Sequence, residues 1–141
     1  MKPTILVSRC LLGEGCRYDG GNNASDAVMR LSSEYRVISI CPECDGGLPV
    51  PRTPSERCGD RVLARDGQDV TIAFRSGAEQ ALSLARAHKI LFAVLKAKSP
   101  SCGKGEIYDG TFTHTLTEGN GVTAELLLRE GYQVFTEKEI V

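Results

Sequence analysis

The sequence contains no apolar run approaching the ~20 residues that a membrane-spanning helix requires, and no charged-then-apolar leader at its N-terminus. These absences argue against membrane insertion and export, and they predict a cytoplasmic protein. There is also no long block of Lys or Arg: 17 basic residues stand against 18 acidic ones, for a net charge of -1. A chain with this balance lacks the electrostatic footprint of a dedicated nucleic-acid binder, so nucleic acid is not an expected partner.

No internal repeat is visible, and 141 residues that are 41% apolar and 25% charged have the length and composition of one globular domain. We therefore expect residues 1–141 to form a single domain. A chain of this size buries about 68–70% of the surface that its unfolded form exposes, so its fold needs no disulfide scaffold. Because the cytosol is reducing, the six cysteines are expected to be metal ligands, catalytic thiols or inert buried side chains.

Short apolar runs alternate with longer segments of helical period, a pattern typical of a mostly parallel sheet flanked by helices. The expected fold class is therefore α/β, a single Rossmann-like domain. The expected strands are Thr4–Ser8, Val37–Ile40, Leu91–Leu95 and Gln133–Thr136, and the expected helices are Asn22–Ser33, Thr71–His88 and Val122–Glu130. The strand at Leu91–Leu95 is apolar throughout, which predicts a central position in the sheet. Repeated prolines predict an irregular loop over Leu48–Asp60.

Three cysteines follow predicted strands closely: Cys10, Cys41 and Cys102. Because the carboxyl ends of parallel strands lie at one edge of a sheet, where ligand crevices form, these thiols are expected to converge on one site. The alternative is that each is a small buried apolar residue, the usual role of a lone cytosolic cysteine. The remaining cysteines are expected to be free thiols: Cys16, Cys44 and Cys58.

The segment CPEC, from Cys41 to Cys44, admits three interpretations. A redox CxxC pair normally begins a helix, and the DGGLP segment that follows would end such a helix at once. A zinc site needs four ligands, but there is no second CxxC pair, and His88 and His114 are remote in sequence. Three thiolates without an obvious fourth suit a 4Fe-4S cluster with one iron left open to a substrate.

Several segments resemble motifs of the bacterial thiouracil desulfidase family, in the family's order and over essentially the whole chain. They are SRCLLGEGCRYDGG near the start, CPECDGGLPVPRTPSE in the middle, LKAKSPSCG and IYDGTF later, and GNGVTAELLLREGYQVF near the end. The resemblance implies a single α/β domain that holds a 4Fe-4S cluster through three cysteines, here Cys10, Cys41 and Cys102. It also implies that thiouracil loses its sulfur as sulfide and becomes uracil.

The same resemblance assigns the acidic residue of the CPE motif to Glu43. It assigns the catalytic hydroxyl of the SPSC motif to Ser99 or Ser101, with Ser99 preferred. The alternative for Glu43 is an ion pair with an arginine such as Arg52, and the alternative for the serines is turn capping. Cys44 stands where the motif requires no cysteine, so it is either an accidental thiol or a spare ligand.

A thiocarbonyl sulfur is a soft ligand, and an iron in a sulfide and thiolate environment polarises the C=S bond when it binds that sulfur. Glu43 would then take a proton from the attacking water, and a serine hydroxyl would orient the water or the pyrimidine. The loop after Cys10 is expected to line the substrate pocket with Arg17, Tyr18 and Asp19, Tyr18 by stacking; the alternative is a surface turn. The expected substrate is a thiolated pyrimidine base or small nucleoside. Thiolated RNA, and a metabolite-sensing module without turnover, are the alternatives.

Overall fold

Four apolar segments form a parallel sheet in the computed structural model, which describes residues 2–140. They are β1 (Thr4–Ser8), β2 (Arg36–Ile40), β5 (Ala93–Leu95) and β8 (Val134–Thr136), in the order β2-β1-β5-β8. β1 pairs with β2 from Thr4 opposite Arg36 to Ser8 opposite Ile40. The predicted α/β class with a parallel sheet is confirmed, and β5 lies inside the sheet, as its unbroken apolarity predicted.

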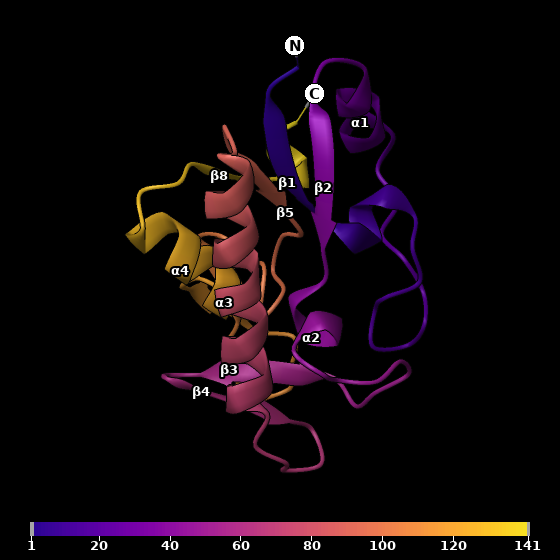
Figure 1. Cartoon of the computed structure of the whole chain (residues 1–141). Coiled ribbons are helices and arrows are strands. Elements are labelled where there is room, and N and C mark those ends of the chain that lie inside the picture. Colours follow the sequence, from indigo (N-terminus) through magenta and orange to yellow (C-terminus); the bar gives the residue numbers. More distant parts are fainter. Residues whose placement is uncertain (1, 141) are drawn as a thin grey trace.

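Helices cover both faces of this sheet (Figure 1). On one face lie α3 (Thr71–His88) and α4 (Val122–Arg129), which share a core with Leu6 of β1. On the other face, a 3-10 turn (Arg9–Leu12) and α1 (Asp26–Met29) pack over Ile5 and Val7 of the same strand. Successive residues of β1 thus enter opposite cores, because side chains alternate along a strand. This explains why the centre of the strand, residues 5–7, is apolar without interruption.

The first crossover segment is less helical than its sequence predicted. Instead of a helix over Asn22–Ser33, α1 forms one turn and continues as a 3-10 helix (Arg30–Ser33). The Asn22 side chain accepts the N–H of Ala24 at 3.0 Å, a local turn that competes with helical hydrogen bonding. The helix therefore begins later, where the Ser25 hydroxyl accepts the N–H of Val28 at 3.3 Å.

The segment Leu48–Asp60 is not irregular throughout, so that prediction was wrong in its second half. β3 (Ser55–Cys58) begins directly after the last proline and pairs antiparallel with β4 (Arg61–Ala64), with Cys58 opposite Arg61. The turn between them is Gly-Asp, a hairpin signal that the prolines masked. A second hairpin, β6 (Glu106–Tyr108) with β7 (Leu116–Glu118), was not predicted from the sequence.

The CPEC segment forms α2 (Pro42–Asp45), a single turn whose backbone packs against α3. A Cβ atom on Gly77 would lie 1.9 Å from the carbonyl oxygen of Pro42, and one on Gly46 would lie 2.0 Å from that of Ala73. Neither position has room for a side chain, so these glycines let the two helices approach at backbone distance. The long helix α3 thereby fixes the position of α2.

Asp69 stabilises the start of α3. Its carboxylate accepts the N–H of Thr71 at 2.9 Å and a guanidinium hydrogen bond from Arg61 at 3.0 Å. The hydrogen bonds from Thr71 and Arg61 lower the pKa of Asp69 to about 2. Since the folded-state pKa lies below the ordinary value of 3.8, this carboxylate stabilises the fold above that value and stops doing so as the pH falls toward 2.

We therefore expect Asp69→Asn to be less stable than the wild type at neutral pH and equally stable near the pKa of about 2 that Asp69 has in the fold. Urea denaturation at a series of pH values measures the difference. A difference in unfolding free energy that stays constant down to this pH would contradict the role of the charge.

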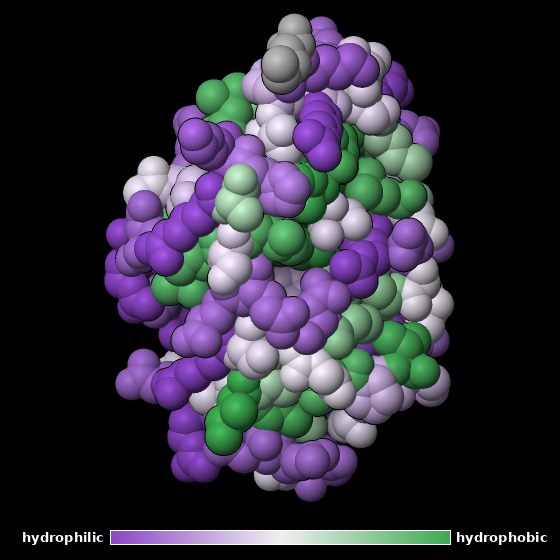
Figure 2. Space-filling model, viewed as in Figure 1, coloured by the Kyte–Doolittle hydropathy of each residue, from purple (hydrophilic) through white to green (hydrophobic). Residues whose placement is uncertain are grey.

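The surface carries charges of both signs. Hydrophilic residues are interspersed with smaller apolar groups on the face shown in Figure 2. Basic and acidic side chains pair across the surface, as Lys104 does with Glu139 at 2.9 Å. Among residues 2–140, no helix is long and apolar enough to cross a membrane.

Candidate functional site

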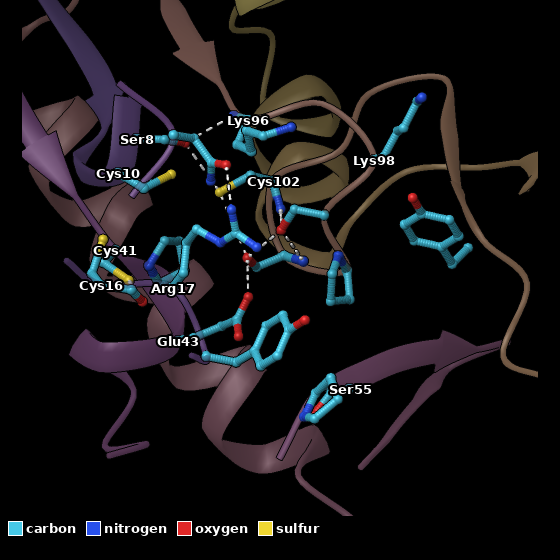
Figure 3. Close-up of a pocket in the computed structure, with 18 of the residues that line it drawn as sticks. Ser8, Cys10, Cys16, Arg17, Cys41, Glu43, Ser55, Lys96, Lys98 and Cys102 are labelled. Carbon is cyan, nitrogen blue, oxygen red and sulfur yellow. Dashed lines mark hydrogen bonds between the residues drawn. The ribbon is translucent and has the colours of Figure 1, made fainter. Parts of the chain in front are cut away.

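A cavity of about 370 Å³ opens at the carboxyl edge of the parallel sheet. Its walls come from the loops that follow β1, β2 and β5 and from the two hairpins (Figure 3). Loops that follow parallel strands meet at one edge, so residues far apart in the chain come together here. The volume is typical of a small-molecule site.

Cys10, Cys41 and Cys102 all line this cavity, and Figure 3 shows their thiols directed into it. Cys10 lies in the 3-10 turn after β1, Cys41 directly precedes α2, and Cys102 lies in the turn after β5. Cys41 and Cys102 are buried, with 8% and 3% of their surface exposed. The convergence predicted from their strand-end positions is therefore observed, whereas their role as ligands stays a prediction.

Hydrogen bonds from Cys16 dominate the electrostatics of two of these thiols. They lower the pKa of Cys10 to about 7 and that of Cys41 to about 6, against burial, which raises both. The pKa of Cys16 itself is raised by the same hydrogen bonds. Burial raises the pKa of Cys102 to about 12. The lowered pKa values of Cys10 and Cys41 favour the thiolate, which is the form that binds metals.

The arrangement of thiols discriminates between the metal sites considered from the sequence. Within the described part of the chain, no group of three or more His, Cys, Asp or Glu side chains has the geometry to hold a single metal ion. A mononuclear zinc site has ligands that surround one atom. In an iron–sulfur cluster each thiolate binds a different iron, so the ligands are more widely spaced. The soft donor set and the size of the cavity fit such a cluster.

Glu43 faces the cavity from α2 and begins a chain of hydrogen bonds. Its Oε2 accepts a hydrogen bond from Ser101 Oγ at 3.0 Å, and the Ser101 and Ser99 hydroxyls lie 3.0 Å apart. Ser99 Oγ also accepts the N–H groups of Ser101 and Cys102, each at 3.1 Å. Ser99 therefore caps the turn that carries Cys102; it also lines the cavity, and its catalytic role stays a prediction. Ser101, which is 2% exposed, contacts Glu43 directly.

The ion pair between Glu43 and Arg52 is also present. The Arg52 guanidinium lies 3.1 Å from Oε1 of Glu43, which leaves Oε2 to Ser101. Burial lowers the pKa of Arg52, but the charges of Glu43 and Cys44 outweigh it, so the net shift is upward. Glu43 thus places one oxygen on a fixed cation and the other on a hydroxyl.

Of the three residues predicted from the loop after Cys10, the cavity contains two. Arg17 and Tyr18 line it, and Asp19 is not among its lining residues. The Asp19 carboxylate accepts hydrogen bonds from Arg17 at 3.3 Å and from the N–H of Gly21 at 2.9 Å. Asp19 therefore belongs to a surface turn and reaches the cavity through Arg17.

One wall of the cavity is aromatic; the motif IYDGTF contains part of it, although no pattern in the sequence predicted its place in the site. Its aromatic side chains come from the β6–β7 hairpin: Tyr108 ends β6, and Phe112 and His114 lie in the connection to β7. Glu56 of β3 holds this segment, because its carboxylate accepts the N–H groups of Gly110 and Phe112 at 2.9 and 3.1 Å. Phe112 and His114 have positive φ angles, 58° and 56°, which are rare for residues other than glycine. No local sequence pattern predicts these positive φ angles.

A parallel sheet covered on both faces, with thiols, a carboxylate and hydroxyls in one cavity at its carboxyl edge, defines an α/β protein with a site suited to a soft metal centre. The chain belongs to the 2-thiouracil desulfurase family, whose model matches residues 5–139.

Two relatives extend this finding. The chain is 40% identical over 146 residues to the uncharacterized protein YbbK of Bacillus subtilis (strain 168), covering 96% of this chain and 97% of that protein. It is 48% identical to a solved structure of the [4Fe-4S]-dependent thiouracil desulfidase TudS, with a TM-score of 0.93. That match covers 98% of this chain and 93% of the TudS chain, so the similarity extends to the whole fold.

Proposed function

We propose that this protein is a 4Fe-4S-dependent thiouracil desulfidase, which converts 2- or 4-thiouracil and water to uracil and sulfide. Membership of the family and the likeness to TudS support the reaction. The observation in this chain that carries the proposal is one cavity lined by three loop thiols together with the hydrogen-bonded Glu43 and Ser101. The free cysteines of residues 2–140 suit a reducing cytoplasm, where we propose that the enzyme acts as a single-domain protein.

We assign Cys10, Cys41 and Cys102 as the protein ligands of the cluster. All three line the cavity, and each follows a strand of the parallel sheet closely. Three ligands leave one iron without a protein thiolate, and when the cluster is bound this iron supplies a Lewis acid for the thiocarbonyl sulfur. Cys16 stays outside the ligand set, and its backbone carbonyl accepts a hydrogen bond from the Cys41 thiol at 3.8 Å.

Glu43 is the general base of the proposed reaction. Its carboxylate is held by Arg52 and Ser101 and faces the cavity, where it takes a proton from water as the water oxygen adds to the ring carbon. The same proton is then available to the departing sulfur. Oxygen replaces sulfur at the same oxidation state of carbon, so no electron donor is required.

The remaining cavity residues orient and enclose the ring. The Ser101 hydroxyl both donates and accepts hydrogen bonds, so it can orient the water or the pyrimidine beside Glu43. Tyr18 and Phe112, which both line the cavity, provide apolar surface for the flat ring. We propose that the substrate is a free base or small nucleoside, because a net charge of -1 provides no electrostatic platform for RNA.

Glu43→Gln tests this assignment, because it keeps the shape of the side chain and removes the base. We expect kcat for sulfide release to fall by a factor on the order of 10² to 10⁴. The iron content and visible absorbance of the anaerobically reconstituted protein are expected to stay unchanged. Glu34→Gln, an exposed position, is the matched control. Full turnover in Glu43→Gln would refute the role of Glu43, and cluster-loaded wild type that releases no sulfide from either thiouracil would refute the reaction.

A further inference from the structure

We infer that Arg52 is a positioning residue of this reaction: its guanidinium fixes Glu43 so that a single carboxylate oxygen faces the serine hydroxyls. The inference rests on the proposed function of Glu43 as the base. Arg52 also lines the cavity, and the role inferred for it is exercised through the Glu43 carboxylate.

The Arg52 guanidinium has five N–H donors; four of them make hydrogen bonds, and Nη2 also forms an ion pair with Glu43. Nε and Nη2 both lie 3.1 Å from Oε1 of Glu43. Nη2 also donates to the carbonyl oxygen of Cys16 at 3.0 Å. Nη1 donates to the carbonyl oxygen of Pro49 at 3.1 Å and to the Cys44 thiol at 3.6 Å. With 8% of the side chain exposed, this fork is held in one orientation.

These contacts join three separate segments around one carboxylate. They are the chain from Pro49 to Arg52, the α2 turn that carries Glu43, and the loop that contains Cys16. The backbone of Arg52 is fixed as well, since its N–H donates to the carbonyl oxygen of Tyr18 at 2.7 Å. Because Arg52 occupies Oε1 from one side, Oε2 is the oxygen that remains for Ser101, at 3.0 Å.

A lysine would not reproduce this geometry. Its ammonium is a point charge on a flexible stem, whereas the planar guanidinium engages the carboxylate with two nitrogens and still reaches two carbonyl groups. Arg52→Lys, which keeps the positive charge but not the planar guanidinium, should therefore retain only part of the turnover. A residue that merely held the loop together would instead affect substrate binding and cluster retention along with turnover.

The test is a double-mutant cycle on the reconstituted enzyme, with Arg52→Ala and Arg52→Lys each made in the wild type and in Glu43→Gln. In the wild type we expect Arg52→Ala to lower kcat about 10- to 100-fold, with KM and iron per chain unchanged. The kcat of Arg52→Lys should lie between those of the wild type and Arg52→Ala. Added guanidinium ion should raise the turnover of Arg52→Ala. In Glu43→Gln the same substitution should cost less than about threefold, because the positioned base is already missing. Arg30→Ala, an exposed position, is the control.

The outcomes separate this inference from the proposed function. If Glu43→Gln retains full turnover, the role of Glu43 fails and the inference fails with it. If Glu43→Gln loses turnover and Arg52→Ala costs the same factor in both backgrounds, the inference alone is overturned. Loss of iron in proportion to activity would also overturn it. Should Arg52→Ala not accumulate as folded protein, the same comparisons hold for Arg52→Lys.

Discussion

Replacing Cys102 by alanine is expected to abolish cluster binding and, with it, sulfide release. With three proposed ligands, the loss of one leaves two thiolates, too few to hold the cluster against loss to solvent. The Cys102 side chain is almost fully buried, and Ser8 Oγ donates to its sulfur at 3.3 Å, so its position is fixed by packing and by a neighbouring strand end. Iron and acid-labile sulfide per chain, visible absorbance and sulfide release are measured after anaerobic reconstitution. Activity should fall by on the order of 100-fold or more.

Two further thiols serve as controls for this prediction. Cys58 is exposed in β3 and is not among the cavity-lining residues, so Cys58→Ser should retain both iron and turnover. Cys44 lies beside the site, and Cys44→Ser should likewise retain the cluster if it is not a ligand. Full iron content in Cys102→Ala would contradict the ligand assignment. Iron that persists in Cys102→Ala but disappears when Cys44 is also replaced would identify Cys44 as the spare ligand.

Gly77→Ala is expected to have the largest effect on stability. In an exposed helix interior this substitution stabilises by about 1 kcal/mol, because alanine is the better helix former. Here the new Cβ would lie 1.9 Å from the carbonyl oxygen of Pro42 and 2.6 Å from its carbonyl carbon, which are backbone atoms that cannot rotate away. Relieving the overlap requires α2 to move from α3, at a cost of about 3 kcal/mol or more. The steric overlap therefore outweighs the gain in helix propensity, so Gly77→Ala lowers the free energy of unfolding instead of raising it.

The effect of Gly77→Ala is measured by urea denaturation of the cluster-free protein and by iron content after reconstitution. Because α2 carries Glu43 and follows Cys41, its displacement should reduce iron content as well as stability. Glu79→Ala, exposed on the same helix, is the control and should change the unfolding free energy by less than about 0.5 kcal/mol. A Gly77→Ala variant more stable than the wild type would show that the two helices do not approach at backbone distance.

The parallel sheet could be predicted because its signal is local. β1 sends Leu6 into one core and Ile5 and Val7 into the other, and burial on both faces leaves an apolar run in the sequence. The hairpins depend on distant contacts. The segment around Phe112 is held by Glu56, 56 residues away in sequence, and no pattern near Phe112 records that contact.

The candidate site also has parts that the sequence predicted and parts that depend on distant contacts. The convergence of the thiols followed from the rule that parallel strand ends share an edge, and the same rule pointed to Ser8, which was overlooked. The position of Glu43 followed from its closeness to Cys41. The ion pair between Glu43 and Arg52 was one of the alternatives considered from the sequence. Its geometry could not be predicted, because the orientation of Arg52 depends on the carbonyl of Cys16, 36 residues earlier.

The aromatic wall of the cavity belongs to a hairpin separate from the sheet that positions the thiols. In the proposed reaction, the groups that cleave the bond and part of the surface that encloses the ring therefore lie on different segments of the chain. A library that varies Tyr108, Phe112 and His114 while keeping Glu56 would sample new substrates without disturbing the reacting groups. Substitutions in this hairpin are therefore expected to change which sulfur-containing compound is bound.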